Sequence, residues 1–383
     1  MPLASGANVG LSYVKEVTRG TTPGSPSMKT LRAMSRNINK TRSAIVSQER
    51  RQDRQVADMR HGFEQVGGSL GYELSVASFD DMLEGAMSSA WVNAPTHAAV
   101  NLAAASGTNK FTRASGSWIN DGFFPGLEIN VTGFATGGNN GRATVVSVTA
   151  QDLFVSKTLT TEATAASRTC AGVGKILKVG STLTTYTIER RFPDVAQYQV
   201  FRGVAINSMS ISMQPDQMIG GTLELLGMSG GAFQGSTLGN PAAAPSNSPL
   251  VAFQANILVD GVPQAVVTSL DLTIANGRSV QPVCGSRFSP DVFEGTAQVT
   301  GNLSAFFENA TLHNIFENEL EKAISCRMDD PNGTDFLAVH MPRTKFSSST
   351  MDPPQEGPVT SQYQYQALVD SATNTSLIIQ RSN

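Results

Sequence analysis

The residues that could do chemistry are few and lie far apart in the chain. The histidines are His61, His97, His313 and His340, and none has the spacing of a metal-binding motif such as HExxH. Acidic pairs occur at 80–81 and 329–330. The first pair lies on the polar face of an expected helix, and the second precedes a Pro-Asn-Gly turn. Both pairs therefore indicate solvated charge rather than an acid and a base that act together.

Cysteine usage and the glycine-rich runs also argue against an enzyme. Cys170, Cys284 and Cys326 are odd in number and widely spaced, as expected of reduced thiols rather than of disulfides or a zinc site. The run Gly137–Gly141 lacks the Lys-Ser/Thr ending of a phosphate loop, so it predicts a tight turn. No nucleophile elbow or dinucleotide fingerprint is present. We predict no catalytic, cofactor-binding or metal-binding residue, no cofactor, and no enzymatic activity.

Composition narrows the class of protein further. The 383 residues are 40% hydrophobic and 15% charged, with a net charge of −3, so no strong basic field indicates nucleic-acid binding. No run approaches the roughly 20 apolar residues of a membrane helix, and the first 20 residues lack the apolar block of a secretory signal. Thirty-five glycines and 18 prolines favour short strands joined by turns. The expected fold class is mainly β.

One polar stretch, 41–62, stands out by its arginines. Arg42, Arg50, Arg51, Arg54 and Arg60 alternate with Glu49, Asp53 and Asp58. A nucleic-acid patch would be more uniformly basic, so the mixed signs favour a solvated loop or a surface that contacts a protein partner.

Alternation and turn signals divide the chain into an N-terminal arm (1–27), a first half (28–97 and 176–227), an insert (98–175), a linker (228–249) and a second half (250–383). In the insert, short alternating strands around 127–131, 146–148 and 153–155 predict a small β-barrel. The Asp260–Gly261 turn predicts a hairpin between strands at 253–259 and 266–274.

The two halves repeat one order of elements. The strand 31–39 ends in Asn39-Lys-Thr-Arg-Ser43, and the strand 270–276 ends in Asn276-Gly-Arg-Ser279. A poorly patterned stretch, a second strand and a short amphipathic helix follow in each half. The helices are expected at 79–91 and around 312–320, where apolar residues recur at helical spacing. We interpret the chain as two diverged copies of one unit, of which only the first carries the insert.

Several stretches carry a resemblance to a known family. They are 68–91, Tyr186-Thr-Ile-Glu-Arg-Arg-Phe192, Tyr198-Gln-Val-Phe-Arg-Gly203, 206–213 and 220–227, and within the insert 111–118, 121–126 and 138–141. They resemble the tail tube proteins (major tail proteins) of siphophages, some of which carry a small inserted barrel. The resemblance implies β-sandwich halves with a flanking helix, stacked rings, and a lumen through which the genome leaves the capsid.

The resemblance also implies partners and a location. The chain would assemble with itself, with the tape measure and with other tail proteins, in the host cytoplasm and then in the virion, and double-stranded DNA would pass without sequence-specific binding. Tubes of single-repeat relatives are sixfold, so two units per chain predict a trimeric, pseudo-sixfold ring, with a hexamer as the alternative. A long loop orders on ring stacking in this family, and the matching residues are Arg42, Arg50, Arg51, Arg54 and Arg60.

The alternative function is a secreted or surface β-rich adhesin or carbohydrate-binding module. Such a protein would share the Ser/Thr-rich composition, but it should carry a signal or anchor. A carbohydrate-active protein should also expose clustered aromatic residues beside paired carboxylates. Trp91 and Trp118 are isolated in the sequence, with no such pair nearby.

Overall fold

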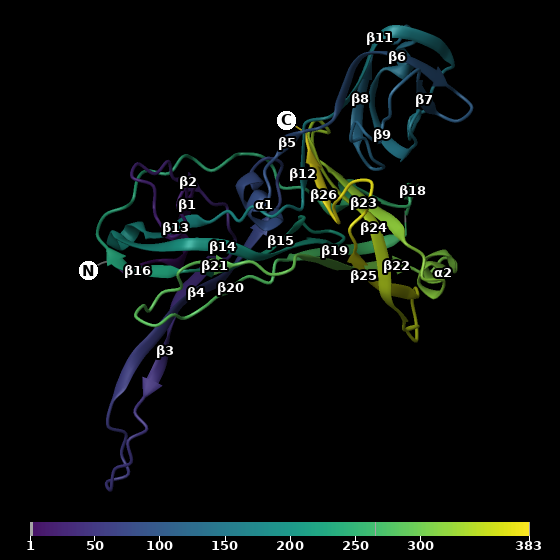
Figure 1. Ribbon diagram of the computed structural model, residues 1–383. Helices are drawn as coiled ribbons and strands as arrows, with labels where there is room; N and C mark the ends of the chain where they lie inside the picture. Colours follow the sequence, from purple (N-terminus) through teal and green to yellow (C-terminus); the bar gives the residue numbers. More distant parts are fainter. Residues whose placement is uncertain (1–2, 265, 383) are drawn as a thin grey trace.

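The computed structural model describes residues 3–264 and 266–382, and it places a long two-part body beside a separate small barrel (Figure 1). The protein is mainly β, as predicted. The two α-helices of the described residues, α1 (Asp80–Met87) and α2 (Thr311–Glu317), each lie where the sequence predicts one, though each is shorter than expected.

The first half consists of nine elements, and β14 (Gln197–Met213) is the long strand at its centre. They are β1 (Gly10–Lys15), β2 (Lys29–Thr30), β3 (Asn37–Val46), β4 (Met59–Glu73), α1, β13 (Tyr186–Phe192), β14 (Gln197–Met213), β15 (Gly220–Gly227) and β16 (Ser229–Gln234). The N-terminal part of β14 pairs with β13 and β16, and its C-terminal part pairs with β15. Strand β14 therefore belongs to two sheets, and Gly203, with a φ of 61°, lies near the crossing.

The second half repeats this scheme. Its elements are β17 (Ala255–Val259), β18 (Val262–Pro263), β19 (Val267–Ala275), β22 (Gln298–Phe306), α2, β23 (Lys322–Asp329), β24 (Phe336–Met351), β25 (Thr360–Ala367) and β26 (Ile378–Arg381). Strand β24 pairs with β23 and β26 first and with β25 later, just as β14 pairs with β13, β16 and β15. Likewise β22 pairs with β19 and β25, as β4 pairs with β3 and β15.

The repeat extends to the hydrogen-bond register. The β14–β15 ladder has a bulge between Ile206 and Ser208, and the β24–β25 ladder has one between Phe346 and Ser348. A glycine also recurs, because a Cβ on Gly68 or on Gly301 would lie 2.0 Å from a backbone oxygen of the partner strand. Gly68 lies opposite Ile38, and Gly301 lies opposite Leu272. The two halves thus share their strand order, a bulge and a glycine at equivalent positions.

The inserted barrel closes on itself and has its own core. Its strands, in the order β10-β7-β6-β11-β8-β9, are β6 (Thr96–Ala105), β7 (Lys110–Arg113), β8 (Glu128–Thr132), β9 (Gly141–Val148), β10 (Asp152–Val155) and β11 (Glu162–Gly172). Trp118, Phe111 and Leu127 are fully buried inside it. Two short strands, β5 (Val92–Asn93) and β12 (Lys175–Lys178), pair with each other at its base, and β12 also pairs with β26.

Remaining elements connect the halves. The segment 276–297 contains β20 (Ser279–Val280) and β21 (Val292–Phe293), and it runs back along the first half (Figure 1). Short 3-10 turns occur at η1 (Gly6–Asn8), η2 (Gly137–Asn139), η3 (Pro193–Val195) and η4 (Ala252–Gln254).

Some local predictions are wrong because pairing partners lie far away in the sequence. The arm expected to be irregular contains β1, which pairs with β13, and the expected linker contains β16, which pairs with β14. The Asp260–Gly261 turn forms, but the return strand β18 has two residues. Strand β19 pairs with β14 and β22 instead, because both offer long edges.

The barrel is attached to the second half by polar and aromatic contacts. The Gln380 side chain accepts from the Glu128 N–H at 2.8 Å and donates to the carbonyl oxygens of Glu128 and Val173. Arg327 forms an ion pair with the Glu128 carboxylate at 2.5 Å. Phe124 stacks on the His340 ring at 5.5 Å between centroids. These contacts hold the barrel against β23, β24 and β26.

Candidate functional site

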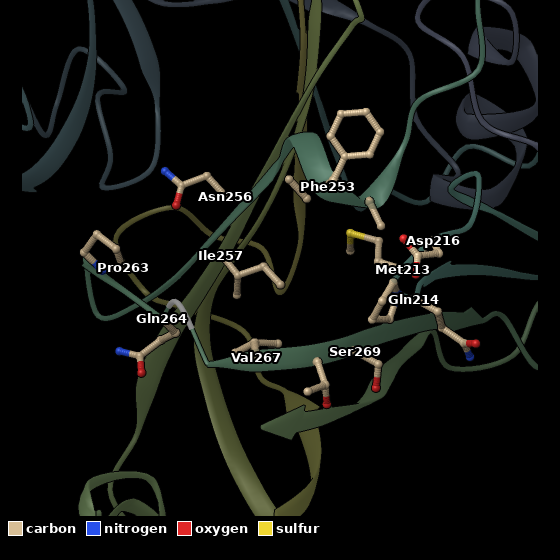
Figure 2. A pocket seen from close by; sticks show the side chains of 14 residues that line it. Met213, Gln214, Asp216, Phe253, Asn256, Ile257, Pro263, Gln264, Val267 and Ser269 are labelled. Atoms are coloured by element: carbon tan, nitrogen blue, oxygen red, sulfur yellow. The ribbon is translucent and has the colours of Figure 1, made fainter. Parts of the chain in front are cut away.

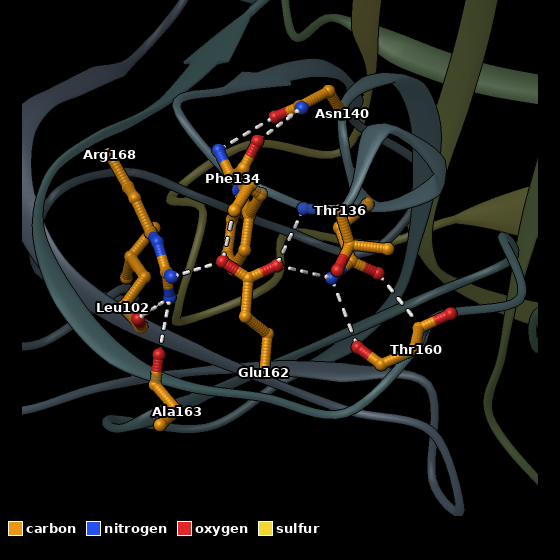
Figure 3. A network of polar contacts seen from close by, with 10 residues as sticks. Leu102, Phe134, Thr136, Asn140, Thr160, Glu162, Ala163 and Arg168 are labelled. Atoms are coloured by element: carbon orange, nitrogen blue, oxygen red, sulfur yellow. Dashed lines mark hydrogen bonds and ion pairs between the residues drawn. The ribbon is translucent and has the colours of Figure 1, made fainter.

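A polar network around Glu162 and Arg168 lies within the barrel (Figure 3). Burial raises the pKa of Glu162, but hydrogen bonds from the Thr136 and Ala135 N–H groups and the Arg168 charge outweigh it and lower the pKa to about 2. Arg168 also donates to the Leu102 and Ala163 carbonyls, and it lies 4.0 Å from the Phe134 ring centroid. The two charges of the network, Glu162 and Arg168, form an ion pair with each other.

The histidines are spread over separate structural contexts. His97 lies on β6 beside Arg113, and His313 lies on α2 near Glu317. His340 is buried on β24, where its Nδ1 contacts the Ser325 hydroxyl at 2.6 Å. Within 3–264 and 266–382, no group of three His, Cys, Asp or Glu residues could hold a metal ion. None of the helices described in this chain is long and apolar enough to cross a membrane.

A groove of about 370 Å³ lies where the two halves meet (Figure 2). It is formed by the end of β14, by η4 and by β17–β19. Its lining is mainly apolar and amide, with Asp216 as its one carboxylate, and the Phe253 side chain is 82% exposed beside it. The groove has no pair of groups that could act as acid and base.

The arginine-rich stretch forms a long β-hairpin that projects from the body (Figure 1). The prediction of a loop from 41 to 62 is therefore wrong at both ends, because β3 continues to Val46 and β4 begins at Met59. Cross-strand pairing here offsets the lack of an apolar pattern. We call residues 41–64 the arginine hairpin, with a root at 41–46 and 59–64 and a tip at 47–58.

The five predicted arginines are distributed along this hairpin. Arg42 lies on β3 and pairs with the buried Glu64 at 2.7 Å, and Arg60 on β4 pairs with Asp58 at 2.9 Å. Arg51 pairs with Asp53 in the tip and lowers the pKa of that carboxyl. Arg50 and Arg54 have no acidic partner in the described part of the chain. The structure thus places the five along one arm and does not gather them into a single site.

Two strand edges remain open. Strand β3 pairs only with β4, and residues 345–351 of β24 pair only with β25, among all strands that the structure describes. An open edge presents unpaired backbone N–H and C=O groups, which can pair with another chain. The equivalent edges inside the chain are joined: β14 pairs with β19 from Ser208–Ala275 to Met213–Leu270.

The junction between the halves was not predicted. Its buried apolar pair is Ile211 and Leu272, and Asn276 and Arg278 continue it onto α1. The expected correspondence of Asn276 in the Asn276-Gly-Arg-Ser279 run with Asn39 is wrong. Because Ile38 corresponds to Leu272, Asn276 corresponds to Arg42. The Asn276–Ser279 run was the sequence signal for this junction. Its alignment with the first half could not be deduced from the sequence, because β3 extends beyond the expected end at Asn39.

Comparison with known proteins gives a family for this arrangement. The family model described as Phage tail tube protein matches residues 6–367. No curated protein sequence matches the chain.

Proposed function

The chain belongs to the phage tail tube protein family, and from this premise we propose that three copies form each ring of a stacked tube that conducts the genome into the host. As a member of the family it is a structural protein of the phage tail, and the adhesin interpretation loses its support. The proposed partners are further copies of the chain, the tape measure and other tail proteins, with assembly in the host cytoplasm.

The observation that carries the proposal is the match between the internal junction and the open edges. Within the chain, the first half offers β14 and the second half offers β19. Strand β24 of the second half is the equivalent of β14, and β3 of the first half is the equivalent of β19. The edges of β24 and β3 that correspond to this junction are open in the described chain. A head-to-tail contact between them repeats the internal junction, and repeated heterologous contacts close into a ring. Three chains then supply six units in pseudo-sixfold order; six chains would be the hexameric alternative.

The repeated bulges specify the register of this contact. Aligning Ile206 with Phe346 and Gly68 with Gly301 places Met351 opposite Ile38, where the chain itself pairs Ile211 with Leu272. Thr350 then lies opposite Asn39. Both apolar pairs fall on the same face of the strand, as a continuous sheet requires.

Two other parts have roles in the proposal. Arg42, Arg50, Arg51, Arg54 and Arg60 belong to one arm, whose tip, with Arg50, Arg51 and Arg54, reaches beyond the sheet and contacts the adjacent ring. The inserted barrel stands on the outside of the tube. The net charge of −3 suits a lumen in which DNA slides, because each added phosphate contact would hold it back.

Disulfide cross-linking tests the register and the ring together. Asn39→Cys and Thr350→Cys are combined with Cys284→Ser, since Cys284 is the exposed native thiol and Cys170 and Cys326 are buried. We expect oxidised tubes to give monomer, dimer and trimer bands on a non-reducing gel, and nothing larger. Chains with only one of the two new cysteines are the control. A ladder to six would favour the hexamer, and the absence of cross-links would refute the register.

A further inference from the structure

The two equivalent helices differ in how their C-terminal ends are covered. Ser88 and Asn318 are the C-cap residues of α1 and α2, and each donates its N–H to the carbonyl four residues earlier. The residues at the end of α1, Met87 and Ser88, are buried. At the end of α2, Glu317 and Asn318 are exposed.

The segment that covers α1 comes from the other half. The Asn276 side-chain amide donates to the Ala86 carbonyl at 3.0 Å. The Arg278 guanidinium donates to the Gly85 carbonyl at 3.1 Å and to the Ser88 hydroxyl at 2.6 Å. The Arg278 cation also interacts favourably with the helix dipole, whose C-terminal end is negative. The first half thus receives a basic, hydrogen-bonding segment that follows β19.

The segment that would cover α2 is the root of the arginine hairpin. It follows β3, the equivalent of β19, and Arg42 holds the position of Asn276. Arg60 lies on the adjoining strand, opposite Ile45, and its side chain is 79% exposed. Within its own chain the hairpin points away from the body, so it does not fill this role there (Figure 1).

The charges of the two surfaces are complementary. The C-terminal end of α2 carries Glu317, and Glu319 follows it, with side chains 58% and 77% exposed. The hydrogen bond from Lys345 holds the pKa of Glu319 low, so this carboxylate is charged at neutral pH. Lys345 pairs with Glu319 at 2.7 Å. The negative charge available at this end therefore comes from Glu317 and the helix dipole, whereas the hairpin root presents the exposed Arg60.

We propose that the root of the arginine hairpin docks on the C-terminal end of α2 of the neighbouring chain in the same ring, with Arg60 facing Glu317. This inference rests on the proposed ring and on the pairing of β3 with β24. In this proposal the two parts of the hairpin have different partners. The root contacts the neighbouring chain of the same ring, and the tip contacts the next ring.

A charge-swap experiment tests the contact in the full-length protein. Glu317→Arg and Arg60→Glu each place like charges together, so we expect each to raise the concentration at which half of the protein is in rings by about tenfold. The double variant restores the opposite charges and should return this concentration to near the native value. Glu308→Arg, an exposed change before the start of α2, is the matched control and should assemble normally. Sedimentation velocity measures ring formation, and thermal unfolding checks that each monomer is folded.

The outcomes separate this inference from the ring proposal. If the single variants form rings as the native chain does, the contact with α2 is wrong while the ring proposal stands. The same conclusion follows if the double variant is no better than the singles, or if stacking fails while single rings form normally. If the native chain forms no rings under any condition, the proposed function itself fails.

Discussion

The segments that follow the equivalent strands β3 and β19 differ in where they lie. In the second half, residues 276–297 fold back on the first half, where Val292 is buried and Asp291 pairs with Arg19. In the first half, the arginine hairpin projects from the body and leaves Ile45, Val56 and Met59 more than half exposed. A duplicated chain can satisfy only one of two equivalent contacts internally. The other is left for a second copy, and this difference explains why one chain bears both an internal junction and its unpaired counterpart.

Removing the projecting segment should have the largest effect. Replacing residues 47–58 by Asn-Gly joins the paired residues Val46 and Met59 by a two-residue turn, so we expect a folded monomer. Tubes should be absent from negative-stain images, because the tip is proposed to join neighbouring rings. Unchanged thermal unfolding would confirm that the body is intact. Tubes of normal length would contradict the assigned role of the hairpin.

Removing the equivalent contact inside the chain should reduce stability rather than assembly. Arg278→Ala leaves carbonyl groups at the end of α1 unpaired and opens a cavity, so we expect a loss of about 3 kcal/mol in the free energy of unfolding. Urea unfolding measures it. Arg50→Ala at the hairpin tip is the matched control, and we expect a change within about 0.5 kcal/mol. Equal effects of the two substitutions would remove the contrast between the folded and the projecting segments.

A third test uses a position where the halves differ chemically. His340 on β24 corresponds to Val200 on β14 and lies against the barrel. Burial lowers the pKa of His340 to about 4, although the nearby Asp370 charge opposes this shift. The unfolded chain therefore binds the proton first as pH falls. Stability should decrease from about pH 6.5 towards pH 4 and then level off.

The His340→Val variant removes the contribution of His340 to the pH dependence of stability. Between pH 7 and pH 5, the native chain should lose up to about 2 kcal/mol more in its free energy of unfolding than the variant does. Urea titrations at the two pH values measure the difference. Parallel losses in both proteins would show that His340 is not responsible.

Removing the barrel should affect assembly least. Strand β12 pairs with β5 and β26, so a deletion from 98 to 175 would cut into the body at Lys175. Replacing 96–172 by a short Gly-Ser linker avoids this. We expect tubes that form as before, with a thinner outline in micrographs and a small loss of stability where Gln380 is uncovered. Failure to form tubes would show that the barrel takes part in the ring.

Much of the fold was predictable because its signals are local. Alternation correctly indicates β8, β10 and β19, and helical spacing correctly indicates α1 and α2. Strands β1 and β16 were missed because they are short or rich in glycine, and their stability comes from pairing with β13 and β14. The five arginines were found as a charged stretch, but their arrangement along a hairpin depends on the cross-strand pairs of β3 and β4.

The sequence by itself determined the mainly β class, the duplicated order of elements, the inserted barrel and the absence of recognisable catalytic motifs, since each of these is written in residue types and short-range spacing. Only the tertiary structure decided which edges are joined and which remain open. Backbone pairing is not specific to side chains, so β19 could pair with several strands, and burial of Ile211 against Leu272 selects β14. The fold-back of residues 276–297 was decided in the same way, because Asn276 and Arg278 find their partners on α1 only after the two halves have come together.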